Sequence, residues 1–309
     1  MDGLDAAVTV MVGAIRAGTP LVFAALGELV AEKSGVLNLG VEGMMLVGAV
    51  VGFMVTVTTG NAYLGILAAI LAGTLMSAIF GFLTLSLRTN QVATGLALTI
   101  FGVGLSAFLG IKYVGTPIKG LKPFDLPGLS DLPVIGPLLF GHDLLIYVSF
   151  ALFLAISWFL YRSRAGLVLR AVGESHDAAH ALGYSVIKIR YLAVMFGGAC
   201  AGLSGAYLSL VYTPQWAENM TAGRGWIALA LVVFATWRPG RAILGAYLFG
   251  GITIMGLHIQ ALGFEISSHL VATLPYIATI IVLALISRDA TKIRLNAPAS
   301  LGKPFHPAA

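Results

Sequence analysis

Long uncharged apolar runs recur along this chain of 309 residues, and they constrain its fold more than any other feature. Runs close to the length of a membrane span lie at 63–87, 92–111, 144–161, 191–213, 242–264 and 266–287, with shorter ones at 17–27, 43–60 and 225–237. Roughly 20 apolar residues in a helix cross a bilayer, where the backbone must satisfy its own hydrogen bonds. Strands of membrane barrels alternate polar and apolar residues, and these runs do not. The sequence predicts an all-α polytopic membrane protein with about nine or ten transmembrane helices.

The low content of charged residues supports the same fold class. Only 10% of the residues are charged, whereas a soluble domain carries about 25%. The 38 glycines suit the close approach of helices inside a membrane. Cys200 is the single cysteine, which excludes an intrachain disulfide and a metal site built on cysteines.

The distribution of lysine and arginine gives the chain an orientation. If the turn at Arg88 faces the cytoplasm, alternating spans place thirteen of the 18 basic residues inside and four outside, with Arg16 unassigned. The four outer residues are Lys112, Lys119, Lys122 and Arg224. This is the positive-inside pattern of a multi-pass plasma-membrane or inner-membrane protein. It requires 219–237 to cross the membrane, with Arg224 reaching outward from the outer end of that span.

The chain is predicted to form one transmembrane domain over residues 1–309. Its core covers about 15–287, an inner loop takes 162–190, and a basic tail of 288–309 extends into the cytoplasm. Arg16 interrupts the first apolar stretch. Either residues 5–15 lie along the membrane interface, or one tilted span carries an arginine that reaches the interface. The side of the N-terminus stays open between these interpretations.

The inner loop holds a polar segment with helical periodicity between two apolar spans. Glu174 and Asp177 lie near its start, where the helix dipole favours acidic side chains. Ala178 and Ala179 give it a packing face, and Gly183 suits a helix C-terminus. Such a segment is either a solvated amphipathic loop helix or a surface on which a soluble partner docks.

Polar residues at the mouths of two apolar runs are candidates for a translocation path. Asn38 and Glu42 share a helix face, and a carboxylate in a membrane needs a partner or water. Gln91 and Thr94 open the run 92–111. The alternative is structural: Glu42 would stabilise a helix start through the dipole, and the amide and hydroxyl would bond neighbouring helices.

Several motifs of other function classes are absent from the sequence. There is no P-loop motif for nucleotide hydrolysis, no nucleophile elbow or dinucleotide fingerprint, and no arginine ladder or potassium-channel filter. His176 and His180 share a helix face, but without a third ligand they do not predict a metal site. No catalytic set of charged groups converges in the apolar runs, so a membrane enzyme is the least favoured class.

Segments spread over about residues 15–287 resemble permease subunits of ABC importers in the branched-chain amino acid/ribose group. The likeness is greatest to the branch for nucleosides and simple sugars. The segments that carry it are 18–20, 27–45, 90–95, 171–183, 223–230 and 238–245. Of these, 27–45 is the most specific, and it contains Asn38 and Glu42.

The resemblance implies a type II importer architecture with several partners. Two permease chains, often different ones in this branch, form the path. Two cytoplasmic P-loop ATPase subunits bind ATP and magnesium, and an extracytoplasmic binding protein or lipoprotein delivers the solute. This chain would bind no cofactor or nucleic acid and would have no ATPase site of its own.

The resemblance also assigns the inner helix as the element that couples to the ATPase. Its residues would be Gly173, Glu174, Asp177, Ala178, Ala179 and Gly183. His176 and Asp177 depart from the asparagine and proline typical of the family after this glutamate. The expected function is ATP-driven import of nucleosides, with simple sugars or branched-chain amino acids as alternative solutes. An ion-coupled secondary transporter is the alternative mechanism, for which Glu42 is the one candidate acid.

Overall fold

The computed structural model describes residues 3–124, 132–261 and 296–306, with scattered positions between 270 and 284. Helices dominate these residues, and no strand is found among them. The α-helices are α1 (Gly3–Lys33), α2 (Val41–Thr59), α3 (Ala62–Gly81), α4 (Gln91–Gly110), α5 (Leu144–Arg162), α6 (Arg164–Glu174), α7 (His176–Ala181), α8 (Val186–Tyr207), α9 (Arg224–Phe234) and α10 (Pro239–Ala261). Short π-helical turns extend α3 over Phe82–Ser86 and α8 over Leu208–Tyr212, and another, Gly136–Phe140, precedes α5.

Six helices of the described residues are long and apolar enough to cross a membrane, which confirms the predicted polytopic all-α fold. They are Ala7–Lys33, Val41–Thr59, Ala62–Ser86, Gln91–Tyr113, Leu144–Arg162 and Val186–Tyr212. α10 is a further helix of 23 residues, and it packs along α1. Most of the predicted span 266–287 lies outside the described residues, so the total of nine or ten stays a prediction.

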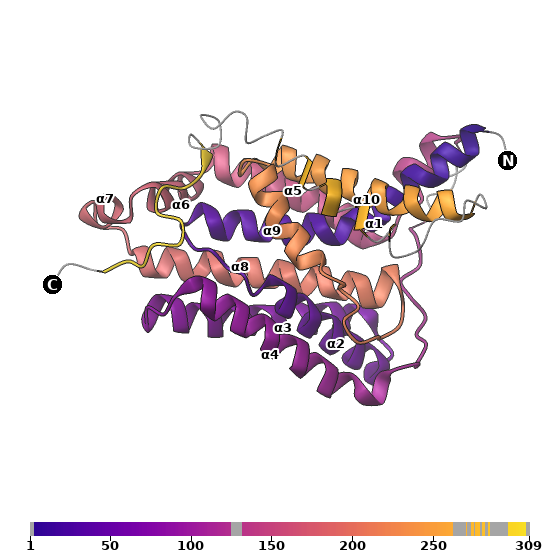
Figure 1. The fold of residues 1–309 in the computed structure, drawn as a ribbon, viewed down its shortest axis with the longest axis horizontal. Helices are drawn as coiled ribbons and strands as arrows, with labels where there is room; N and C mark the ends of the chain where they lie inside the picture. Colours follow the sequence, from indigo (N-terminus) through magenta and orange to yellow (C-terminus); the bar gives the residue numbers. More distant parts are fainter. Residues whose placement is uncertain are drawn as a thin grey trace.

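The N-terminal stretch forms one continuous helix, as the interpretation with a single tilted span expects. α1 runs from Gly3 to Lys33 and contains both Arg16 and Pro20. Arg16 lies near the middle of α1, and its side chain is exposed. The N-terminus lies at the end of the bundle opposite α7, as Figure 1 shows.

α8 is the central helix, and small residues let its neighbours approach it closely. It packs against α1, α2 and α3. A Cβ atom added to Gly48 of α2 would lie 2.5 Å from the Cα of Gly202. One added to Gly73 of α3 would lie 2.8 Å from the same Cα. Real Cβ atoms do not approach so closely, so these glycines fix the distance between backbones, as small residues do in membrane helix pairs.

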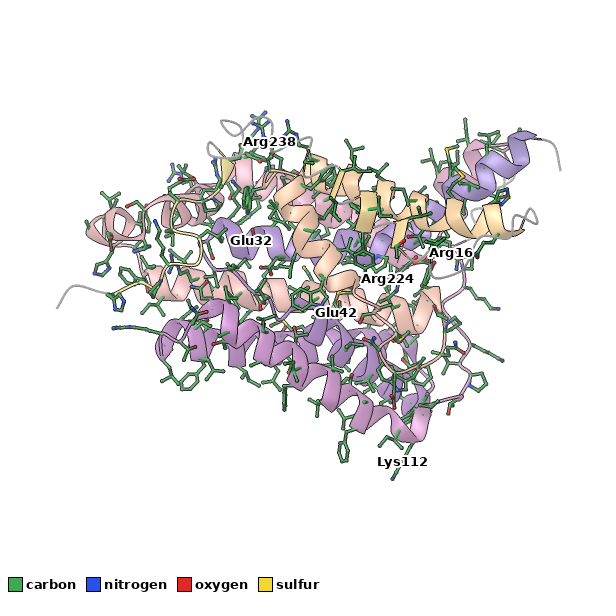
Figure 2. The ribbon with its side chains drawn as sticks, viewed as in Figure 1. Arg16, Glu32, Glu42, Lys112, Arg224 and Arg238 are labelled. Atoms are coloured by element: carbon green, nitrogen blue, oxygen red, sulfur yellow. The ribbon has the colours of Figure 1, made fainter. Side chains whose placement is uncertain are left out.

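The two ends of the bundle differ in charge. At the end that holds α6 and α7, Lys33 Nζ donates to the Asn296 carbonyl at 2.7 Å, and Arg88 Nη1 lies 3.2 Å from His306 Nδ1. Lys112 lies at the opposite end (Figure 2). Lys33 and Arg88, which the positive-inside pattern places in the cytoplasm, thus lie at one end, and Lys112, which it places outside, lies at the other. We refer to the end with α6 and α7 as the basic end.

Residues 219–237 do not form one helix across the membrane, contrary to the sequence prediction. α9 covers only Arg224–Phe234, and residues 213–223 before it are not helical. Arg224 is half-buried at the start of α9, and its guanidinium lies over the ring of Tyr212, the last residue of the span Val186–Tyr212. Its Nη1 donates to the carbonyls of Met220 and Thr221. The helix can begin inside the protein because a buried carboxylate from α2 accepts its first N–H groups.

Candidate functional site

α2 begins in the interior of the bundle rather than at its surface. After α1 ends at Lys33, residues 34–40 run back into the bundle before Val41 starts α2. A Cβ added to Gly43, in the first turn of α2, would lie 2.8 Å from the Cα of Thr99, and Thr99 lies near the middle of α4. Two helix starts, those of α2 and α9, therefore meet inside the protein.

Glu42 joins these two helix starts. Its side chain is 3% exposed. One carboxylate oxygen accepts from Thr221 Oγ1 at 2.6 Å and from the Gly223 N–H at 2.8 Å. The other accepts from the Gly225 N–H at 2.5 Å. A carboxylate at a helix N-terminus is stabilised by the unpaired N–H groups and by the dipole. The structure thus places Glu42 as a tether from α2 to α9.

A second buried glutamate holds the opposite end of α9. Glu32 of α1 accepts a hydrogen bond from the indole Nε1 of Trp237 at 2.5 Å. Thr236 and Trp237 both have left-handed backbones, with φ of 49° and 53°. Such conformations cost about 1–3 kcal/mol each in non-glycine residues and persist where surrounding contacts hold them. α9 is therefore suspended between Glu42 at its start and Glu32 just beyond its end.

Glu28 completes a set of three buried carboxylates, each bound to a non-helical segment. One of its oxygens accepts from the backbone N–H of Asn38 at 3.0 Å. The sequence analysis did not single out Glu28 or Glu32. Two acidic residues four positions apart in an apolar helix could have indicated their buried roles from the sequence, because acids inside a membrane mark functional or tightly paired positions.

Of the candidate path residues, Asn38 and Gln91 both hold the 34–40 segment. Asn38 is fully buried, and its Oδ1 accepts from the Gly40 N–H at 2.9 Å. Gln91 Oε1 accepts from the Leu37 N–H at 2.8 Å, while its Nε2 is buried without a partner among the described residues. Thr94 lies apart from them, with its hydroxyl 2.8 Å from that of Thr89. The structure brings Asn38 and Gln91 together with Glu42 around one chain segment.

The coupling residues predicted from the sequence lie on a helical hairpin at the basic end. Ser175 ends α6 and begins α7, and its Oγ accepts from the Ala178 N–H at 3.3 Å. Asp177 and Ala178 are exposed, while Ala179 is 2% exposed and packs inward. Gly183 ends the hairpin with a φ of 88°. The solvent-facing side of α7 is therefore available to a partner, as a docking helix requires.

Gly173 and Glu174 have different positions at the end of α6. Glu174 is exposed. Gly173 is buried, and a Cβ there would overlap the carbonyl of Lys33 at the end of α1. Gly173 thus allows the hairpin to lie directly against α1, so a displacement of α6 reaches α1 without an intervening side chain.

The described part of the C-terminal tail packs against this hairpin, and we call residues 296–306 the strap. The hydroxyl of Ser300 donates to the Gly173 carbonyl at 2.6 Å. Phe305 is 7% exposed, and its ring lies 5.4 Å and 5.3 Å from the rings of His176 and His180. The two histidines therefore hold an aromatic ring. No group of potential metal ligands occurs among the described residues.

Arg190 ties the strap to the start of α8. This side chain is 1% exposed, and it donates to the carbonyls of Ser34 and Lys303 at 3.1 Å and 3.0 Å. Its Nη2 lies 3.3 Å from His176 Nδ1. Burial, together with the nearby Arg190 cation, lowers the pKa of His176 below its usual value. The hairpin, the strap and the end of α1 are thus one connected structure.

Comparison with known proteins decides the family. The model of the family described as "Branched-chain amino acid transport system / permease component" matches residues 10–286. The chain belongs to this family. The permease is 42% identical over 309 residues to a Haloferax volcanii protein named "Putative glucose ABC transporter permease protein", covering 93% of this chain and 94% of the relative. No solved structure showed a significant match.

Two further relatives carry nucleoside names. The guanosine ABC transporter permease protein of Bacillus subtilis is 33% identical over 305 residues, or 93% of the permease and 92% of the relative. The nucleoside ABC transporter permease protein of Lactococcus lactis is 32% identical over 281 residues, or 86% and 88%. These likenesses and the six apolar helices establish a multi-pass plasma-membrane permease subunit of an ABC transporter, a system that includes ATPase and binding-protein partners.

Proposed function

We propose that the permease imports nucleosides and is driven through the α6–α7 hairpin by a cytoplasmic ATPase. Two of the three relatives described above are named for nucleosides or guanosine, which supports this solute class. The relative at 42% identity is named for glucose, so a simple sugar is the second candidate. Both classes carry a hydroxyl-rich ring, which suits recognition by a few polar groups in an apolar path.

The observation that carries the coupling proposal is the position of α7. Its exposed side includes Asp177 and Ala178, whereas Ala179 faces inward. Gly173 lies against the end of α1, and α1 carries Glu28 and Glu32. A partner that pushes on α7 thereby moves the helix that holds the 34–40 segment and one end of α9.

The suspended helix α9 is our candidate for the element that opens and closes the path. It is short, and buried carboxylates hold both of its ends. α9 also packs against α1, α2 and α10, so a displacement of these helices would move α9 as a unit between discrete packing arrangements. In this proposal Asn38, Glu42 and Gln91 act as part of the gate, and Thr94 lines the path.

The test is transport by the reconstituted complex. The permease would be purified with its ATPase and its second permease subunit, here taken as a different chain, and inserted into proteoliposomes with the binding protein supplied outside. We expect ATP-dependent uptake of labelled nucleoside and competition by other nucleosides. Competition by glucose alone would favour the sugar candidate. Uptake driven by an ion gradient without ATP would refute the coupling proposal and favour a secondary transporter.

A matched pair of variants tests the hairpin itself. Glu174→Lys reverses an exposed charge at the end of α6, and Lys188→Glu reverses an exposed charge at the same end of the bundle outside the predicted coupling residues. We expect the first to separate ATP hydrolysis from uptake and the second to leave them coupled. Equal uptake in the wild type and Glu174→Lys would remove the coupling assignment.

A further inference from the structure

A polar cavity of about 740 Å³ lies at the basic end, away from the Glu42 tether. It lies between the ends of α1, α5 and α6 and the start of α10. Arg238, labelled in Figure 2 at the edge of the ribbon, lies at its rim. The other charged residues of the lining are Lys33, Arg170, Glu174 and Arg241.

The charge of this lining is strongly positive. Four of its described side chains are cationic, those of Lys33, Arg170, Arg238 and Arg241, and one is a carboxylate, that of Glu174. The net charge is therefore +3. Arg238 and Arg241 are exposed and Arg170 is half-buried, and like charges gathered around one cavity repel each other unless an anion lies between them. The cavity thus has the electrostatics of an anion site.

The hydrogen-bond partners that the structure describes for these cations are neutral, and the carboxylates of Glu174 and Glu32 act on Lys33 at longer range. Lys33 and Arg238 both donate to Asn296, to its carbonyl at 2.7 Å and to its Oδ1 at 3.4 Å. Arg241 donates to the hydroxyl of Thr236 at 2.7 Å. No salt bridge to any of the four cations is found in the described part of the chain. Each cation retains donors for a further acceptor, since Lys carries three and Arg carries five.

Arg170 lacks a partner for one of its donors. Its guanidinium lies over the ring of Tyr161, 5.5 Å from the ring centre. Its Nε is buried and has no hydrogen-bond partner among the described residues. A buried donor without an acceptor costs about 1–3 kcal/mol. An anion in the cavity would remove that cost.

Exposed apolar side chains lie along α5 and α10, two of the helices that contribute residues to the lining. Leu154, Trp158 and Tyr161 are exposed and follow one face of α5. Leu244 and Leu248 are exposed on α10, which contacts α5. In a membrane protein such rows face acyl chains, and Trp and Tyr favour the level of the headgroups. The cavity therefore opens beside the lipid, at the depth where lipid phosphates lie.

We propose that this cavity binds the phosphate group of an anionic phospholipid from the inner leaflet, with the acyl chains along α5 and α10. Basic pockets between transmembrane helices on the cytoplasmic side have the chemistry that recognises such headgroups. Arginine provides paired donors that match phosphate oxygens. The apolar rows favour a lipid over an acidic segment of a soluble partner, which would need no acyl-chain surface. The site is independent of the solute that the permease carries.

The experiment compares lipid binding to the full complex in mild detergent. Short-chain phosphatidylglycerol is titrated against the thermal midpoint, with short-chain phosphatidylcholine and inorganic phosphate as parallel probes. We expect phosphatidylglycerol to raise the midpoint and the other two to leave it unchanged. Arg238→Gln together with Arg241→Gln should weaken the apparent affinity roughly 20- to 30-fold, since each basic residue near an anionic surface contributes roughly a fivefold step. Arg164→Gln, an exposed cation on α6 outside the cavity, should have no effect.

Native mass spectrometry of the wild-type complex provides a second measurement that does not depend on the folding of a variant. An anionic phospholipid retained by the wild-type complex would support the proposal, and a wild-type complex that retains none would contradict it. Equal phosphatidylglycerol binding by the double variant would overturn it. Inorganic phosphate that reproduces the shift would assign the site to a free phosphate group instead of a lipid. Loss of the ATPase from the double variant without a change in lipid binding would make the cavity a partner contact and would also overturn it.

Discussion

Replacing Glu42 by glutamine tests whether this residue tethers α9 or contacts the solute. Glutamine keeps the shape and one acceptor oxygen. In its best orientation the amide oxygen keeps the bonds to Thr221 and Gly223, and the amide NH₂ faces the N–H of Gly225. One hydrogen bond to a carboxylate is lost and a buried donor stays unpaired, which costs about 2–4 kcal/mol. The destabilisation should lower the thermal midpoint by roughly 3–6 °C, because a chain of 309 residues has a large unfolding entropy.

The assay is the thermal midpoint of the purified permease complex in detergent, measured beside nucleoside uptake. Glu218→Gln is the matched control, because Glu218 is exposed in the segment before α9. Thr221→Val removes one donor to Glu42 and should cost about 1–2 kcal/mol. In the Glu42→Gln background, Thr221→Val should cost less than it does in the wild type, because hydrogen bonds to a neutral acceptor are weaker. A wild-type midpoint for Glu42→Gln together with impaired uptake would refute the tether and make Glu42 a solute contact.

Three further predictions concern the basic end of the bundle. Glu174→Lys should abolish the coupling of ATP hydrolysis to uptake. Its free energy of unfolding should change by less than about 1 kcal/mol, because substitutions of exposed residues usually have small effects. An unfolded variant would contradict this prediction. Phe305→Ala should detach the strap at a cost of about 3 kcal/mol, seen as faster hydrogen exchange in residues 296–306, and unchanged exchange would show that the ring does not anchor the strap. Burial and the Arg190 cation lower the pKa of His176, so this histidine takes up a proton more readily in the unfolded state. The strap should therefore be fully stable above the usual histidine range near pH 6.5. Its stability should fall as the pH drops through the lower pKa that His176 has in the folded state. In His176→Gln this pH dependence of exchange should disappear, and its persistence would assign the titration to another group.

The sequence by itself determined the helices of the bundle. The six spans among the described residues fold locally, because in hydrocarbon a backbone can bond only within its own helix. Local capping is also encoded in the sequence: Asn90 at the start of α4 accepts from the Ala93 N–H, as asparagine commonly does at a helix start. The inner helix was found in the same way, from the acids near its start and Gly183 at its end. Its position on the basic end agrees with that reasoning.

Only the tertiary structure decided where the incomplete helices begin and what the buried acids do. The partners of Glu42 lie 179 to 183 residues away, and Trp237 lies 205 residues from Glu32. No local pattern encodes such pairs, so the sequence left the role of Glu42 open and did not predict the non-helical segment 213–223 before α9. A short helix such as α9 can start inside a membrane protein only if distant groups accept its first N–H bonds. Those distant acceptors, together with the packing of the strap, belong to the folded chain and not to any single segment of it.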